Sequence, residues 1–228
     1  MRLTMHRELP GFMHFAKCEV AAMNGLKKLC VWGSFVAAVG LAFGCGASRP
    51  SKYYQLTPPS GSTSSANQDA PPISLLLGPM QTSHLYREDR IVYSSERQQM
   101  GTYETERWSE PPVEMMQGVL LRKLRNSGHY RDVNTLRSGA RGDYLLRGRL
   151  YDFKEVSGKS LIARLSFDLE MHDTKTNGTV WTYSYSFDEP VSGKDVASVV
   201  AALDLNVQRA AGEVAGALDQ YFSSHPPK

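Results

Sequence analysis

Three neighbouring segments between residues 143 and 187 alternate apolar and polar side chains, and this pattern constrains the fold most strongly. In residues 163–171 every second residue is apolar, and polar or charged residues stand between them. A period of two predicts β-strands with one buried and one wet face. Asn177-Gly178 predicts a hairpin turn with positive φ at both positions. The expected inward-facing residues are Tyr144, Leu146, Gly148 and Leu150, then Ala163, Leu165, Phe167, Leu169 and Met171, then Trp181, Tyr183, Tyr185 and Phe187.

Shorter stretches upstream also predict strands. Residues 73–77 form an apolar run that we expect Gly78-Pro79 to end. Residues 90–95 and 101–108 are typical of a hairpin around a polar turn. We expect its last residue, Trp108, to be buried where the sheet meets a helix. Before these stretches, the short apolar segment Tyr53-Tyr54-Gln55-Leu56 is expected to dock as an edge strand.

Two segments carry apolar residues at three- and four-residue steps, which predicts helices. In the first, Ser109 is expected to cap the helix, Pro111 and Pro112 to lie in its first turn, and Gly128 to follow its end. The second is expected to run from about Asp195 to Phe222. We therefore predict an α+β fold, an antiparallel or mixed sheet with two helices on one face. The expected apolar stripes are Val113, Met116, Leu120 and Leu124, and Val196, Val200, Leu203, Val207, Ala211, Val214, Leu218 and Tyr221.

The first 45 residues resemble a bacterial lipoprotein signal. Lys27-Lys28 precede an apolar run over residues 29–43, and Cys45 follows the small residue Gly44. The run is shorter than the roughly 20 residues that span a bilayer. We expect a signal peptide over residues 1–44, cleaved before Cys45, whose thiol and new amino group receive acyl chains such as palmitate. Met23 is an alternative start that would leave residues 1–22 outside the signal. An ordinary signal peptide and a transmembrane helix are the competing interpretations.

After the anchor we expect a Pro/Ser-rich tether over residues 45–72, a folded domain over residues 73–222, and a tail over residues 223–228. The tether would lengthen the reach of the domain from the membrane. Residues 1–45 hold five of the 26 Lys and Arg residues and two of the 23 Asp and Glu residues, so the remainder carries 21 of each. A neutral mature chain gives no support to nucleic-acid binding.

Motifs for catalysis are missing from the sequence. We found no phosphate-binding glycine loop, no nucleophile elbow and no histidines at metal-ligand spacing. His172-Asp173 is the nearest approach to a catalytic pair, and a surface pair explains it better. We expect no enzyme activity, no cofactor and no metal site, and after cleavage Cys45 is the only cysteine.

A chain without catalytic residues must act by binding, and we expect two surfaces to carry this role. One is the strand edge at Tyr53, Tyr54 and Leu56, which could pair with a partner or with another copy of the chain as a homo-oligomer. The other is a basic stretch that would steer an acidic partner or lipid headgroups, although an ordinary solvated face also explains it. Its candidate residues are Arg122, Arg147 and Arg149.

With these elements in place, the chain resembles the family of ABC-type transport auxiliary lipoproteins, which includes the lipoprotein of the paraquat-inducible system. The resemblance covers roughly residues 50–222 and departs at Pro112, where an apolar residue is typical, and in the long tether. The motifs that carry it are Tyr53-Tyr54-Gln55-Leu56, residues 73–80, Asp89-Arg90-Ile91-Val92-Tyr93, Trp108-Ser109-Glu110-Pro111, Asp143-Tyr144-Leu145-Leu146 with Phe153, and Val200-Ala201-Ala202.

The resemblance implies a non-catalytic lipoprotein that works with a mammalian-cell-entry (MCE) domain protein, a permease and an ATPase. Together these would move lipids or other hydrophobic compounds across the envelope. Gly46 after the cysteine favours the outer membrane, with the domain facing the periplasm. The alternatives are an outer-membrane assembly or scaffolding lipoprotein, such as a cell-wall synthesis activator or a secretion-system component, and a protein that carries lipid itself.

Overall fold

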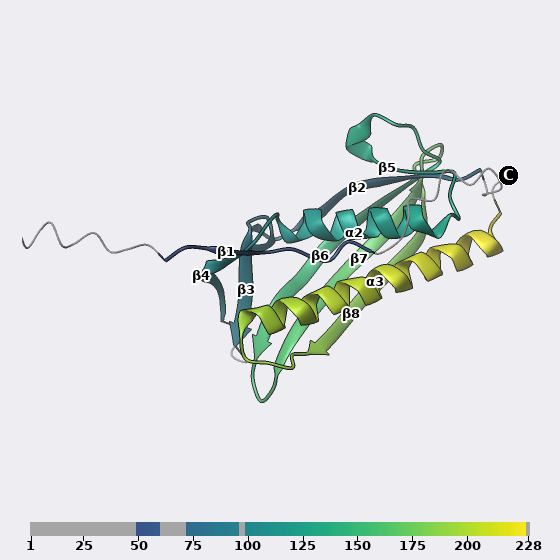
Figure 1. Ribbon diagram of the computed structural model, residues 1–228. Helices are drawn as coiled ribbons and strands as arrows, with labels where there is room; N and C mark the ends of the chain where they lie inside the picture. The colour runs from purple at the N-terminus through teal and green to yellow at the C-terminus, as the bar shows by residue number, and fades with distance from the viewer. Residues whose placement is uncertain (1–48, 60–71, 96–98, 227–228) are drawn as a thin grey trace, which may run out of the picture. The chain divides into compact units, whose positions relative to one another are not determined.

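The computed structural model describes residues 49–59, 72–95 and 99–226. The expected signal peptide, Cys45 and most of the Pro/Ser-rich segment lie outside these residues. From Pro50 onward the chain forms one compact unit, in which two helices lie on one face of an eight-stranded sheet (Figure 1). Its elements are β1 (Lys52–Tyr54), β2 (Ser74–Thr82), η1 (His84–Tyr86), β3 (Arg90–Ser95), β4 (Met100–Trp108), α2 (Pro112–Ser127), β5 (Asp132–Thr135), η2 (Leu136–Ser138), β6 (Tyr144–Ser157), β7 (Leu161–Asp173), β8 (Thr179–Pro190) and α3 (Val196–Ser224).

The sheet is mixed, as predicted, and β6 lies at its centre. Its whole length pairs antiparallel with β7, which in turn pairs antiparallel with β8. On its other side, the first half of β6 runs parallel to β2 and the second half runs parallel to β3. The sheet then continues to β5 beside β2, and to β4 and β1 beside β3. The α+β class is therefore confirmed.

The predicted alternation holds throughout β7, whose five inward-facing residues are all buried. In β6 it holds only as far as Leu150. Tyr151 is an extra residue that the register between β6 and β7 skips, so the buried positions continue at Phe153. A bulge of this kind shifts the side chains beyond it by one position. On β8, Tyr185 is buried, whereas Phe187 is 40% exposed because the sheet edge lies there.

The β7–β8 hairpin is present, but the predicted two-residue turn is wrong. Only Asn177 has positive φ, at 55°. The Asp173 amide donates to the Gly178 carbonyl at 3.0 Å, and the Asp173 carboxylate accepts the amides of Lys175 and Thr176 at 2.8 and 2.9 Å. An aspartate whose carboxylate accepts the backbone amides of the residues after it favours a loop longer than two residues.

Gly78-Pro79 does not end the second strand, contrary to our expectation. β2 continues to Thr82, and its register against β6 shifts between Leu77 and Met80. Proline has no amide hydrogen, so it is tolerated where the ladder is irregular. The Gln117 amide from α2 donates to the Leu77 and Gly78 carbonyls at 3.4 and 2.9 Å, which ties the helix to this irregularity.

The first helix begins later than a Ser109 cap would place it, so that prediction is wrong. Pro111 is the N-cap residue and Pro112 begins α2, because a proline at the first helical position loses no hydrogen bond. Gly128 follows the helix with φ of 68°, as predicted. At α3 the Asp195 carboxylate accepts the Ser198 amide at 2.9 Å, so this helix begins where we expected.

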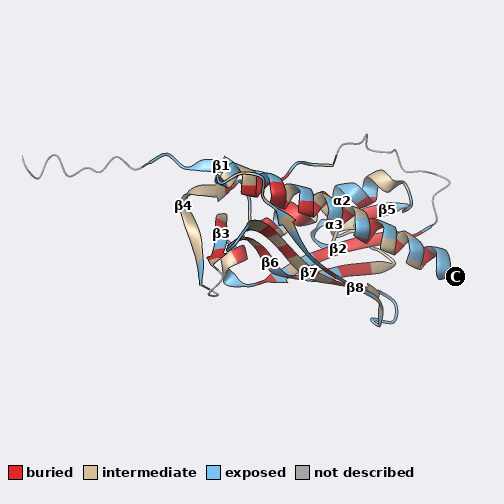
Figure 2. Ribbon diagram, turned by 90° about the horizontal axis from the view of Figure 1, so that it is seen from below, coloured by how far each residue is buried: buried red, intermediate tan, exposed pale blue. Residues whose placement is uncertain are grey.

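The core fills the space between the helices and the sheet, where buried residues gather (Figure 2). Trp108 is 1% exposed, which confirms its predicted burial, and its ring centroid lies 5.3 Å from that of Phe153. Asn206 of α3 is fully buried and donates to the carbonyls of Ala163 and Phe187 at 3.1 and 3.0 Å. This side chain therefore fixes α3 over β7 and β8.

Candidate functional site

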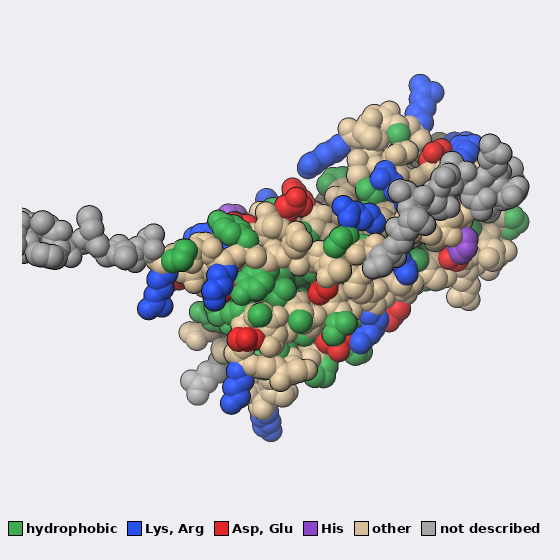
Figure 3. Space-filling model, viewed as in Figure 1, with side chains coloured by type: hydrophobic (Ala, Val, Ile, Leu, Met, Phe, Trp, Pro, Cys, Tyr) green, Lys and Arg blue, Asp and Glu red, His purple; other side chains and the backbone are tan. Residues whose placement is uncertain are grey.

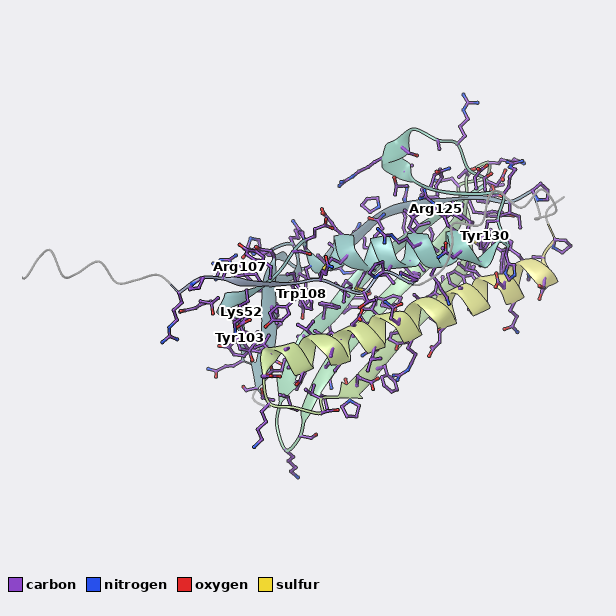
Figure 4. All side chains as sticks on the ribbon, in the orientation of Figure 1. Lys52, Tyr103, Arg107, Trp108, Arg125 and Tyr130 are labelled. Atoms are coloured by element: carbon purple, nitrogen blue, oxygen red, sulfur yellow. The ribbon has the colours of Figure 1, made fainter. Side chains whose placement is uncertain are left out.

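An edge strand forms as predicted from the sequence, but it covers Lys52–Tyr54, so Gln55 and Leu56 lie beyond its end. It pairs in parallel with the end of β4, so that Tyr54 lies opposite Trp108. The Ser109 amide donates to the Tyr54 carbonyl at 2.7 Å, and the Lys52 ammonium lies 3.2 Å from the Glu106 carboxylate. Burial and the neighbouring Glu106 raise the pKa of Tyr54 to about 12. Figure 4 shows the side chains of Lys52, Arg107 and Trp108 gathered at this end of the domain.

Residues 55–59, which we call the strap, continue from β1 between the two helices (Figure 1). Leu56 is 6% exposed and belongs to the core. The Thr57 amide donates to the Asp204 carboxylate at 3.0 Å, and the Gln208 amide of α3 donates to the Thr57 carbonyl at 2.6 Å. The strap is thus held by side-chain burial on one side and by polar contacts to α3 on the other.

A groove of about 200 Å³ lies between the strap and α2. Acidic Glu110 and Glu114 come from the N-terminal part of this helix region, and basic Arg122 comes from further along α2. A Cβ built on Gly118 would meet no atom within 4 Å, so the groove is open at this position. The complete lining is Gln55, Leu56, Pro58, Ser109, Glu110, Glu114, Met115, Gly118, Val119 and Arg122.

Arg147 and Arg149 lie on the opposite face of the sheet, so the predicted basic stretch is not one surface. Arg149 is opposite Asp168 in the β6–β7 register, and Arg147 is opposite Glu170. Residues of this parity on β7 point away from the helices, because the alternate residues face the core. The two arginines line a hollow of about 330 Å³ together with Gln81, Gly148, Tyr151, Asp168, Glu170 and His172.

The structure therefore separates the residues we proposed from the sequence. Tyr53 is 64% exposed and Tyr54 is half-buried. Leu56 forms part of the groove and of the core, so it offers little surface of its own. Sequence reasoning missed Asp204 and Gln208, although polar residues four positions apart on an apolar helix share one face and indicate a contact. Cys45 lies outside the described residues.

No arrangement of His172 and Asp173 as a catalytic pair is present. The Asp173 carboxylate is engaged by loop amides, and the His172 ring lies 3.3 Å from Glu170 and from Thr179. Among residues 49–59, 72–95 and 99–226, no group of three or more His, Cys, Asp or Glu side chains is placed to hold a metal. None of the helices in these ranges is long and apolar enough to cross a membrane.

At the far end of α2, Arg125 and Tyr130 make contacts that join elements (Figure 4). The Arg125 guanidinium donates to the Val133 carbonyl at 2.7 Å, and the Tyr130 hydroxyl donates to Asp219 of α3 at 3.1 Å. Asp219 also lies 2.7 Å from His129. Since each of these groups connects α2, or the residues that follow it, to β5 or α3, the cluster has a structural role.

Comparison with known proteins places the chain in a family. The model of the ABC-type transport auxiliary lipoprotein component matches residues 54–215, from the end of β1 into α3. The chain belongs to this family, as its motifs indicated, and it is an auxiliary lipoprotein of an ABC-type system. A search of curated proteins gave no match.

Solved structures share the fold. The protein XCC0632 from Xanthomonas campestris is 18% identical, with a TM-score of 0.68 over 77% of this chain and 98% of that chain. A second crystal structure, of an uncharacterized protein, is 11% identical, with a TM-score of 0.60 over 75% of this chain and 99% of that chain. At these identities the likeness concerns the fold alone.

Proposed function

We propose that this chain is a non-catalytic lipoprotein, anchored through acylated Cys45 to the outer membrane and facing the periplasm. It serves an ABC-type system that contains an MCE-domain protein, a permease and an ATPase, and that moves lipids or other hydrophobic compounds. The observation that carries this proposal is the family match over residues 54–215, which includes nearly all the strands and most of α3. ATP hydrolysis and cargo translocation belong to the other subunits.

The groove beside the strap is the surface that we assign to the partner. It combines apolar Leu56, Met115 and Val119 with carboxylates and a guanidinium, a mixture typical of protein interfaces with an apolar centre and a polar rim. Because α2 and the strap are both anchored in the core, the groove is preorganised, which reduces the entropic cost of binding.

A homo-oligomer is also part of the proposal, and β8 supports it. Within the described residues, β8 pairs only with β7, so one edge of a strand from Thr179 to Pro190 keeps unpaired backbone groups. An edge of this kind accepts a strand from another copy or from a partner.

Purification of the tagged full chain from mildly cross-linked membranes tests the function. We expect mass spectrometry to identify an MCE-domain protein, a permease and an ATPase with the wild type. Cys45→Ala should strongly reduce the recovery of these partners, and the variant protein should be lost from the membrane fraction. Cys30→Ala, within the expected signal peptide, should behave as the wild type. Recovery of cell-wall synthases or secretion components in place of the transporter would overturn the proposal.

A further inference from the structure

The distance from the expected anchor to the folded domain is short. Seven positions separate Cys45 from Lys52, the first residue of β1. A fully extended chain spans at most about 3.6 Å per residue, so Lys52 lies within about 25 Å of an acylated Cys45. We expected the Pro/Ser-rich segment to lengthen this reach, but it adds nothing to it, because Pro59 before it and Pro72 after it belong to the same compact unit.

β1 is firmly attached to the domain, so the short link also limits the orientation of the domain. The strand is held by its pairing with β4, by the ion pair between Lys52 and Glu106, and by the Ser109 amide. Beyond it, Thr57 is bound to two side chains of α3. Releasing β1 as a longer tether would require breaking all of these contacts and exposing Leu56.

The side chains exposed at this end suit a membrane surface. Tyr53 is 64% exposed and the Lys52 side chain is 71% exposed. Tyrosine is enriched at headgroup level, and basic side chains are attracted to anionic lipids. Of the nearby carboxylates, Glu106 is paired with Lys52, and Asp195, which also interacts with Lys52, accepts the Ser198 amide at 2.9 Å. Glu104 is exposed. Figure 3 shows Lys and Arg side chains beside the point where the described chain begins.

We propose that the β1 end of the domain, with Lys52 and Tyr53, lies against the lipid headgroups of the membrane that holds the anchor. The C-terminal end of α3 then points away from the membrane. α3 begins at the β1 end (Figure 1), and Gln220 follows Val196 by 24 positions, a rise of about 36 Å. This orientation rests on the acylation of Cys45 proposed above.

Fluorescence quenching by headgroup-labelled lipids tests the orientation. Full chains carrying Tyr53→Cys or, as the matched exposed control, Gln220→Cys are purified from membranes and labelled with a thiol-reactive fluorophore. Cys18 and Cys30 lie in the expected signal peptide and the Cys45 thiol is acylated, so the introduced thiol is the only one to react. Each protein is reconstituted into phosphatidylethanolamine–phosphatidylglycerol vesicles that contain a nitroxide headgroup lipid.

We expect the label at position 53 to lose most of its fluorescence and the label at position 220 to keep most of it. Ser51→Cys, also exposed, gives a second reading at the β1 end if the change at Tyr53 disturbs folding. Equal quenching at the two ends, with Cys45 shown by mass spectrometry to be acylated, would overturn the orientation alone. An unmodified Cys45 would overturn both the orientation and the proposed anchor.

Discussion

The two faces of β7 use alternate residues of one strand in opposite ways. On the face covered by the helices, Ala163, Leu165, Phe167, Leu169 and Met171 are at most 4% exposed. On the open face, Arg164 forms two 2.7 Å contacts with Asp188, and the Tyr151 hydroxyl donates to Asp168 at 2.8 Å. The covered face therefore supplies stability, whereas the open face keeps charged groups in water.

This difference separates the two candidate binding surfaces. The groove beside the strap lies on the helix side, where Leu56 and Val119 extend the core to the surface. The hollow at Arg147 and Arg149 lies on the open face among Asp168 and Glu170. Binding at the groove should depend on apolar contact, whereas binding at the hollow should depend on charge and salt.

The largest expected effect is on the covered face. Phe167→Ala removes a 4% exposed ring that stacks on Tyr185 at 5.3 Å. We expect it to lower the free energy of unfolding by about 3–5 kcal/mol in urea titrations. Ser184→Ala, at an exposed position across from Asp168, should change it by less than about 0.5 kcal/mol. Similar losses for both would show that the two faces are not distinguished in this way.

A smaller effect is expected for a buried hydroxyl at high pH. Burial, followed by the charge of Asp152, raises the pKa of Tyr86 to about 12. Because the folded pKa exceeds the usual value of about 10, this stabilisation is complete below pH 10 and is lost as the pH rises towards 12.

At pH 11 the loss amounts to about 1.4 kcal/mol. Tyr86→Phe keeps the ring but cannot ionise. Between about pH 8 and 11, the free energy of unfolding of this variant should therefore fall by about 1.4 kcal/mol less than that of the wild type. Urea titrations at both pH values measure the difference. Equal losses in the two proteins would contradict the burial of this hydroxyl.

The smallest effect on folding is expected on the open face. Reversing both charges, with Arg147→Glu and Arg149→Glu, should lower the free energy of unfolding by no more than about 1 kcal/mol per site, because both side chains are exposed and each new carboxylate faces only one carboxylate across the strand pair, Glu170 or Asp168. If this face steers the partner, recovery of the transporter should fall, and more so at low salt. Recovery equal to that of the wild type at both low and physiological salt would make it a solvated face only.

How far the sequence predicted this molecule depended on how local the determining contacts are. The alternation of β7, the Gly128 end of α2 and the start of α3 at about Asp195 follow from neighbouring residues, and they were predicted correctly. The bulge at Tyr151, the passage of β2 through Pro79 and the Pro111 cap depend on the adjoining strand or helix, which local patterns do not specify.

The candidate site was predicted less well for the same reason. Docking of Tyr53 and Tyr54 at the sheet edge was expected from their apolar character. We did not predict that Arg122 lies on one side of the sheet and that Arg147 and Arg149 lie on the other. A run of basic residues does not reveal which side of a sheet each one occupies. The groove itself could not be predicted from a local pattern, because it forms between the strap and α2, and α2 begins more than fifty residues after the strap ends.

The central claim is that the partner binds the groove beside the strap, and filling that groove tests it most directly. Gly118→Gln places a side chain in open space there, and Gly216→Gln does the same on an exposed part of α3 away from the groove. Both replace a mid-helix glycine, so each should keep or raise stability, by up to about 1 kcal/mol. We predict that Gly118→Gln recovers roughly tenfold less transporter from membranes, equivalent to about 1.4 kcal/mol of binding free energy, while Gly216→Gln recovers the wild-type amount. Wild-type recovery with both variants would contradict the account.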